Sequence, residues 1–290
     1  MPKIGIHASV WTGVLTPETL AESIRRTRAA GFDLLEIPLL NPAGFDVEGA
    51  LSTLSEDPIE LAGSLGLGPT TDISSDDRVR VAAGERLLRD ALDVLSALGA
   101  RHLVGVIYGA MTKQPAPCTP TARRAGIEAL RRVADHAAQL GIELGLEIVN
   151  RYETNVMNTA RHGREYLAEL DRPNVRLHLD TYHMNIEEPD LISPILDSVE
   201  QLGYVHIGES NRGYLGSGTA DLAGCLRALT AIRYDGPIVF ESFSSAVVDP
   251  LLSNVLAVWR NLWDDADDLG AHANRYIRDG LHAAASISQH

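Results

Sequence analysis

The feature that most constrains this chain is a regular alternation of short apolar runs with longer amphipathic segments. Gly, Pro or polar residues bound each apolar run, as they bound the buried strands of parallel sheets. We predict eight strands, at residues 3–10, 34–39, 59–65, 102–108, 142–149, 175–181, 204–209 and 238–243. Strands that alternate with helices in this way indicate an α/β protein with a parallel sheet.

The segments between the predicted strands carry the start and stop signals of helices. Thr16 and Pro17 open the first helix, as an N-cap residue followed by a proline in the first turn. Gly31 ends that helix just before the next strand, and Gly99 and Gly141 stand at equivalent points. Glycine readily adopts the left-handed conformation in which many helices end. This punctuation indicates a repeated βα unit.

Eight βα units in 290 residues match the size of a (β/α)8 TIM barrel. An open, doubly wound sheet would alternate in the same way, but the Gly-rich dinucleotide loop typical of that fold does not follow the first predicted strand. The end of the chain has the pattern of one additional helix. We therefore predict a single TIM-barrel domain over residues 1–290, with a helical extension from about 264 to 290.

Charge and composition argue against several classes of partner. The net charge of -14 disfavours nucleic acid, because a nucleic-acid binder needs a basic surface. No apolar run approaches the ~20 residues that a membrane span needs. Cys118 and Cys225 are far apart and are expected to be free thiols, and the first residues lack the pattern of a signal peptide. We expect a cytoplasmic protein with a small-molecule ligand.

Acidic or imidazole side chains stand near the carboxyl ends of the last four predicted strands. They are Glu147, Asp180, His206 and Glu241. The active sites of TIM barrels lie at this end of the strands. A carboxylate inside an apolar run is costly to bury unless it is paired or binds a cation. Pairing with Arg or Lys would explain one such residue, but a shared metal ion would explain all four.

Three carboxylates and one imidazole make a ligand set that consists mostly of oxygen. Such a set suits a single divalent cation, with Mn²⁺ as the first choice and Mg²⁺ or Co²⁺ as alternatives. Zinc stays open, although the set lacks the thiolates of many zinc sites.

The sequence around these residues resembles the ketose 3-epimerases, a family of xylose-isomerase-like barrels that includes D-tagatose, D-allulose (D-psicose) and L-ribulose 3-epimerases. The resemblance rests on three linked motifs, LEIVNRYE (146–153), HLDTYHMN (178–185) and VHIGESNR (205–212), and it runs from Ile4 to about Phe243. It implies metal-dependent epimerisation at C3 of free ketoses, of the D-allulose/D-fructose, D-tagatose/D-sorbose and L-ribulose/L-xylulose type. The reaction would remove and return a proton through a cis-enediolate. The family also suggests a homodimer or homotetramer.

The resemblance assigns roles to individual residues. It implies that the four strand-end residues named above bind the metal, and that Glu147 and Glu241 are also the catalytic acid and base. The implied substrate contacts are Glu153, His183 and Arg212 at the reacting end, and Trp11, Ile6 and Tyr108 at the far end of the sugar. His7 lies beside this last group in the sequence.

Other functions on the same scaffold stay open. An aldose–ketose or hydroxypyruvate isomerase would use a similar metal and similar glutamates, and it would differ in its product. An endonuclease for abasic DNA would need more metal ligands and a basic groove, and a non-catalytic sugar sensor would not need both Glu147 and Glu241. We expect Glu209 to lie outside the site, and Trp259 and Trp263, at helical spacing, to lie in the core.

Overall fold

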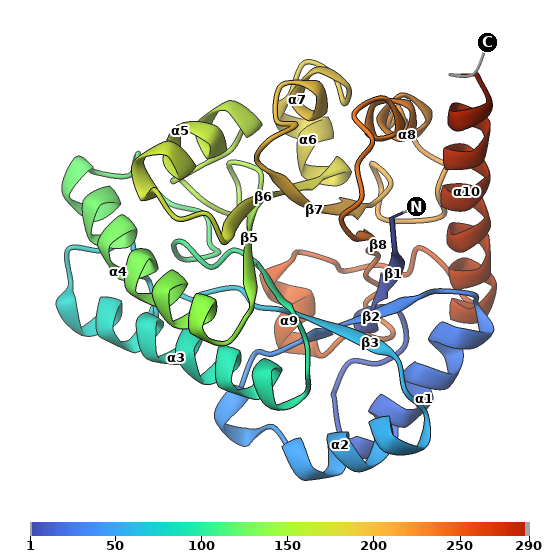
Figure 1. The fold of residues 1–290 in the computed structure, drawn as a ribbon, viewed down its shortest axis with the longest axis horizontal. Coiled ribbons are helices and arrows are strands. Elements are labelled where there is room, and N and C mark those ends of the chain that lie inside the picture. Colours follow the sequence, from blue (N-terminus) through green and yellow to red (C-terminus); the bar gives the residue numbers. More distant parts are fainter. Residues whose placement is uncertain (1, 288–290) are drawn as a thin grey trace.

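The structure is a computed structural model that describes residues 2–287. In this part of the chain, eight parallel strands form a closed barrel in sequence order, with β8 beside β1 (Figure 1). The strands are β1 (Ile4–His7), β2 (Leu34–Pro38), β3 (Glu60–Ser64), β4 (His102–Gly105), β5 (Glu143–Ile148), β6 (Val175–Asp180), β7 (Leu202–Ile207) and β8 (Ile238–Phe240). The predicted (β/α)8 barrel is confirmed.

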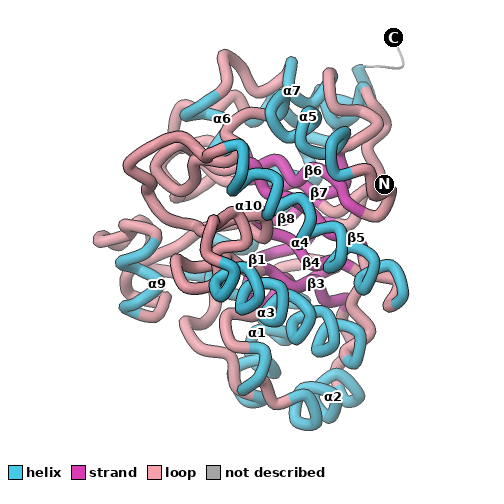
Figure 2. Tube along the Cα trace, turned by 90° about the vertical axis from the view of Figure 1, so that its left-hand side faces the viewer, coloured by secondary structure: helices cyan, strands magenta, loops and turns pink. Residues whose placement is uncertain are grey.

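Helices follow the strands and surround the barrel (Figure 1). The α-helices are α1 (Pro17–Ala29), α2 (Val47–Glu56), α3 (Arg78–Ala97), α4 (Pro120–Gln139), α5 (Ala160–Leu170), α6 (Thr181–Glu187), α7 (Ser193–Leu196), α8 (Leu222–Ala231), α9 (Pro250–Val255) and α10 (Ala266–Ile287). Two short 3-10 helices, η1 (Ala8–Val10) and η2 (Pro42–Gly44), follow β1 and β2. Figure 2 shows α9 apart from this ring, at one end of the barrel. Among residues 2–287, no helix is both long enough and apolar enough to cross a membrane.

The predicted helix signals act as expected. The Thr16 side chain accepts a hydrogen bond from the backbone N–H of Thr19 at 3.3 Å and caps α1. Gly31, Gly99 and Gly141 have φ angles of 86°, 73° and 69°, in the left-handed region where a side chain would be strained. Each of these glycines turns the chain from a helix toward the next strand.

Alternate residues of the strands fill the inside of the barrel in layers. One layer is a small apolar cluster made of Leu34, Ala62, Val104, Tyr204 and Val239. Two positions further along the chain, in these strands or directly after them, stand Glu36, Ser64, Val106, His206 and Glu241. The apolar layer is therefore the floor beneath a polar layer at the carboxyl ends of the strands.

Several strands end earlier than predicted. β1 stops at His7 because its ring Nδ1 accepts a hydrogen bond from the backbone N–H of Ser9 at 3.2 Å, and η1 begins there. β4 stops at Gly105, whose φ of 113° leaves the extended conformation. β8 stops at Phe240, so Glu241 stands directly after a strand rather than inside one.

The predicted C-terminal helix is present as α10, and residues 288–290 of the predicted extension lie outside the described residues. Asn274 on α10 donates a hydrogen bond to the carbonyl of Gly31 at 2.9 Å, which ties this helix to the end of α1. Trp263 is buried as predicted. The core position predicted for Trp259 is wrong, because its side chain is 72% exposed and the segment between α9 and α10 is irregular rather than helical.

Candidate active site

A cavity opens at the carboxyl ends of the strands, where the sequence predicted the site. Six of the predicted site residues line it: Glu147, Glu153, His183, His206, Arg212 and Glu241. The other residues that line it are His7, Pro38, Leu40, Ser64, Leu65, Gly66, Gly105, Val106, Met111, Val149, Phe243, Leu252 and Leu256. Leu252 belongs to α9 and Leu256 follows it directly, so this helix borders the cavity. Asp180 is fully buried just behind the wall.

The four predicted metal ligands converge. Glu147, Asp180, His206 and Glu241 each offer a ligand atom, and these atoms lie within 4.8 Å of one another. The ring Nδ1 of His206 is 3.4 Å from Glu241 Oε1 and 3.8 Å from Glu147 Oε1. This buried nitrogen has no hydrogen-bond partner among the described residues. A buried ring nitrogen that faces two carboxylates without a partner fits a metal ligand.

The charge balance of this group also fits a cation. Arg212 donates hydrogen bonds to Asp180 Oδ2 at 3.2 Å and to the carboxylate of Glu241. Its guanidinium lies 4.0 Å from the centre of the Tyr182 ring. One arginine cannot balance three carboxylates in a place hidden from water. A divalent cation would neutralise the remaining negative charge.

The second ring nitrogen of His206 is held by Glu36, a residue that the sequence did not predict for the site. His206 Nε2 lies 2.9 Å from Glu36 Oε2, and the Tyr204 hydroxyl donates to the same oxygen at 2.7 Å. A metal-ligating histidine commonly donates its other N–H to a carboxylate, which fixes the ring and its tautomer. Glu36 lies inside the apolar run of β2, so the signal that identified the four strand-end residues was also present here.

The two predicted catalytic glutamates have opposite pKa shifts. Burial raises the pKa of Glu147 well above its ordinary value, and the charge of Glu241 adds to the rise. Burial also acts to raise the pKa of Glu241, but the positive charges of Arg212 and His206 outweigh it and hold that pKa well below its ordinary value. The surroundings of the two carboxyl groups thus favour different charges, and the difference arises because Arg212 and His206 act more strongly on Glu241.

His183 points a hydrogen-bond donor at this group. Its Nδ1 accepts from the backbone N–H of Asn150 at 3.2 Å, so its Nε2 carries the proton in the neutral ring. That Nε2 is 3.6 Å from Glu147 Oε1 and 3.7 Å from Asp180 Oδ2. Burial lowers the pKa of His183 well below its ordinary value, which keeps the ring neutral. Glu153 accepts a hydrogen bond from the side chain of Asn150 at 2.9 Å.

The loop that carries Arg212 is fixed by groups on both sides of it. The Glu209 carboxylate accepts hydrogen bonds from the backbone N–H groups of Ser210, Gly216 and Ala220. On the other side, Ser242 donates to the carbonyl of Arg212, and Trp263 donates to the Ser242 hydroxyl at 2.8 Å. As predicted, Glu209 does not line the cavity. It anchors this loop from outside the cavity.

The structure does not bring the other three predicted substrate contacts to the cavity. Ile6 faces the outer core, because residues alternate along β1 and His7 takes the inward position. The fully buried Tyr108 donates to the carbonyl of Glu147 at 2.8 Å. Trp11 donates to Thr27 on α1 at 2.9 Å and packs against α10. The cavity is lined instead by His7, which the sequence offered beside Ile6.

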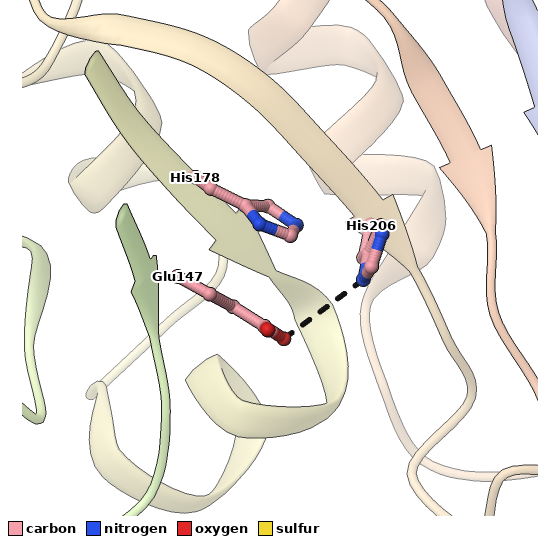
Figure 3. A group of neighbouring side chains, drawn as sticks. All are labelled: Glu147, His178 and His206. Carbon is pink, nitrogen blue, oxygen red and sulfur yellow. Dashed lines mark ion pairs between the residues drawn. The ribbon is translucent and has the colours of Figure 1, made fainter. Parts of the chain in front are cut away.

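A second group of side chains could also hold a metal ion. It consists of Glu147, His178 and His206, whose ligand atoms lie within 4.8 Å of one another (Figure 3). His178 stands two residues before Asp180 on β6 and therefore on the same side of the strand, directed into the barrel. His178 stands in the motif HLDTYHMN, but the sequence alone assigns it no role.

Comparisons with known proteins agree with this geometry. A family model described as Xylose isomerase-like TIM barrel matches residues 24–273. The chain is 56% identical over 288 residues to the ketose 3-epimerase of Arthrobacter globiformis, a match that covers 99% of this chain and 100% of that protein. The chain belongs to the ketose 3-epimerase family. Ketose 3-epimerases are isomerases, so this chain is an isomerase that acts on sugars.

Two further relatives support membership of the ketose 3-epimerase family. The L-ribulose 3-epimerase of Methylomonas sp. strain DH-1 is 50% identical, over 94% of this chain and 96% of that protein. A crystal structure of the D-allulose 3-epimerase from Methylomonas sp. in complex with D-allulose has a TM-score of 0.94 and 50% identity, and the match covers 96% of each chain. The likeness thus extends over nearly the whole chain, including the segments that form the cavity.

Proposed function

We propose that this chain catalyses metal-dependent epimerisation at C3 of free ketoses, such as D-allulose/D-fructose, D-tagatose/D-sorbose and L-ribulose/L-xylulose. The observation that carries the proposal is the convergence of Glu147 and Glu241, together with Asp180 and His206, on one cavity at the carboxyl ends of the strands. The names of the relatives, which include a ketose 3-epimerase and an L-ribulose 3-epimerase, support the same reaction. A small neutral sugar also suits a cavity with polar groups at one end and apolar side chains elsewhere.

Glu147, Asp180, His206 and Glu241 would hold one divalent metal ion, with Mn²⁺ as our first choice and Mg²⁺ or Co²⁺ as alternatives. This assignment is supported by their convergence and by the His206 Nδ1, which has no hydrogen-bond partner among the described residues. When bound, the ion supplies Lewis-acid stabilisation of the negative charge that develops on the sugar oxygens. Glu36 holds the His206 ring so that Nδ1 faces Glu147 and Glu241, the carboxylates that would share the ion with it.

The protein's own groups would move the proton. One of Glu147 and Glu241 removes the proton from C3, which gives a cis-enediolate, and the other returns a proton to the opposite face. The N–H groups of His183 and Arg212 are directed to the same space and would donate to O2, where charge accumulates. Glu153, fixed by Asn150, would accept a hydrogen bond from O1.

The test is a panel of ketohexoses and ketopentoses incubated with the protein and Mn²⁺ in D₂O. We expect each converted sugar to give its C3 epimer with one deuterium at C3, as read by chromatography and NMR. An aldose product with deuterium at C2 would instead assign a 1,2-isomerase. Sugar binding without any exchange would assign a non-catalytic sugar sensor.

We propose that the protein forms a homodimer or homotetramer. Leu251, Val255 and Trp259 are exposed apolar side chains in and just after α9, and apolar side chains of this size are enriched at subunit interfaces. Sedimentation velocity would measure the state. We also propose a cytoplasmic location, supported by the free thiols of Cys118 and Cys225. The packing of α10 against the end of α1 supports our proposal that residues 1–290 form one domain.

A further inference from the structure

His178 is a buried polar side chain that the proposed reaction does not use. Its ring is fully buried inside the barrel, and neither ring nitrogen has a hydrogen-bond partner among the described residues. Burying a polar group without a partner costs free energy, so such a group calls for an explanation by an unseen ligand or by the packing around it.

Packing alone accounts for only part of the environment of His178. Its ring lies edge-on to the ring of His206, with 4.1 Å between ring centres and an interplanar angle of 84°. It also lies edge-on to Tyr204 at 5.0 Å. These contacts satisfy the faces and edges of the ring as an aromatic surface. They leave both nitrogens without a donor or an acceptor in residues 2–287.

The surroundings of His178 supply the other ligands of a metal site. Figure 3 shows Glu147 on β5 and His178 on β6 directed toward His206 on β7. Glu147 and His178 are paired in register on neighbouring strands, so the backbone fixes their side chains side by side. The Nδ1 of His206 is also buried and free of partners among the described residues. Three ligand atoms within 4.8 Å of one another therefore meet inside the barrel.

This group has a different chemistry from the four-residue group beside it. Two imidazoles and one carboxylate form a set that holds Zn²⁺ in many enzymes, with a fourth position left open. The four-residue group offers three carboxylates and one imidazole, which suits harder cations such as Mn²⁺ or Mg²⁺. The groups share Glu147 and His206. An ion bound by one group therefore excludes an ion from the other.

We propose that His178, His206 and Glu147 form a second, inner cation site that selects Zn²⁺ over Mn²⁺. The four-residue group is called the outer group from here on. The inner site goes beyond the proposed function, because it depends on these three side chains and not on the reaction proposed for the outer group. Zn²⁺ in the inner site takes Glu147 and His206 away from the outer group and leaves Asp180 and Glu241 without their shared ion. Zn²⁺ therefore competes with Mn²⁺ for the same protein molecule.

The experiment compares the wild type with His178→Leu after removal of bound metal. X-ray absorption at the zinc edge counts the imidazoles around Zn²⁺, and competition with a chromogenic chelator measures the affinities for Zn²⁺ and Mn²⁺. We expect two imidazoles in the wild type and one in the variant. We expect the Zn²⁺ affinity to fall at least about tenfold, as loss of a ligand or its supporting group does in metal sites. The Mn²⁺ affinity should stay within about twofold.

His102→Leu is the matched control, because His102 is also a largely buried barrel histidine beside Tyr204, with a buried Nδ1 that lacks a partner among the described residues. It belongs to neither metal group, so both affinities should stay at the wild-type values. A single imidazole in wild-type Zn²⁺ protein overturns the inner site, and this reading does not require His178→Leu to fold. Equal loss of Zn²⁺ and Mn²⁺ affinity in His178→Leu also overturns it.

The inner site and the proposed epimerase reaction fail separately. Two imidazoles around Zn²⁺ in a protein that converts no ketose would support the inner site and refute the proposed function. An active Mn²⁺ epimerase with one imidazole around Zn²⁺ would do the reverse.

Discussion

The two halves of the cavity wall differ in chemistry. The half after β5 to β8 carries the charged and imidazole groups, among them Glu147, His206 and Glu241. The half after β1 to β4 is largely apolar, with Leu65, Val106 and other apolar side chains. We infer that the charged half performs the proton transfer, while the apolar half contacts the carbon skeleton and decides which ketose fits.

The two halves are also built differently. In the charged half, Arg212 and His183 receive their positions through hydrogen bonds to groups on neighbouring strands and loops. In the apolar half, positions depend on packing, which tolerates changes of shape better than a hydrogen-bond network does. Glu36 on β2 and His7 on β1 are polar side chains that connect the β1 to β4 half to the charged half. Glu36 is hydrogen-bonded to His206, and His7 Nε2 lies 3.6 Å from Glu36.

The largest expected effect comes from Glu241→Gln in the charged half. The amide cannot accept the proton and weakens the metal ligand set, so kcat should fall by at least about 10³-fold. Steady-state assays with Mn²⁺ and D-allulose or L-ribulose measure it. Thermal unfolding of the variant near the wild-type midpoint shows that the fold is intact. Activity within tenfold of the wild type would remove Glu241 from the proton transfer.

Removal of the metal tests the charged half as a whole. Exhaustive chelation should lower activity by at least about 100-fold, because the charge that develops on the sugar loses its Lewis acid. Added Mn²⁺ or Co²⁺ should restore it in proportion to the ion bound. Full activity in protein shown to be metal-free by elemental analysis would refute the metal site.

Glu36→Gln tests whether a residue from the β1 to β4 half supports metal binding in the charged half. Loss of the carboxylate that holds His206 should weaken Mn²⁺ binding by about 10- to 100-fold. Equilibrium dialysis with Mn²⁺ measures the change. Glu56→Gln, at the exposed end of α2, is the control and should bind Mn²⁺ as the wild type does. Unchanged Mn²⁺ affinity in Glu36→Gln would show that the charged half binds the metal without support from Glu36.

Met111→Ala tests the apolar half by enlarging it. Met111 lines the cavity, where its side chain packs directly against Gly66. The ratio of kcat/KM between a ketohexose and a ketopentose should change by up to about tenfold, in the range that small changes of apolar pocket volume produce. Mn²⁺ affinity should not change. A loss of kcat that is equal for all ketoses would contradict the division of roles.

The smallest effect concerns a histidine that lines neither half. Burial lowers the pKa of His102 from 6.5 to about 4. The unfolded chain therefore binds a proton between these pH values while the folded protein does not, so His102 makes stability fall as the pH drops from 6.5 toward 4. His102→Leu should remove about 2 kcal/mol of the loss in unfolding free energy between pH 7 and pH 5. Denaturant unfolding at the two pH values measures it, and an unchanged pH dependence would refute this role.

The sequence predicted much of the charged half because strand ends can be located from pattern. An acidic or imidazole side chain at the end of an apolar run is conspicuous, and in a barrel the ends of successive strands must meet. The convergence of Glu147, Asp180, His206 and Glu241 follows from that rule. Glu36 carried the same signal on β2, but its role depends on a partner 170 residues away, and no local pattern reveals that partner.

The predictions that differ from the structure lie at two kinds of place. In one, a shift of a single residue reverses which face of a strand a side chain is on, and in the other, a segment with helical spacing is not a helix. Ile6 and His7 are neighbours, and the end of β1 decides which of them faces the cavity. A shift of one residue reverses the face, and predicted strand ends are less precise than that. Trp259 and Trp263 have helical spacing, but their segment is irregular and only Trp263 turns inward.

The sequence by itself determined the barrel, the start of α1, the helix ends at Gly31, Gly99 and Gly141, and the four strand-end ligand groups. It could do so because capping and glycine signals are local and because the alternation of strand and helix repeats eight times along the chain. Only the tertiary structure decided what surrounds those groups. The bond between Glu36 and His206, the fixed loop of Arg212 and the place of His178 beside Glu147 all depend on contacts between different strands and loops. Such contacts follow from how the barrel closes and how its strands stagger, which no short stretch of sequence specifies.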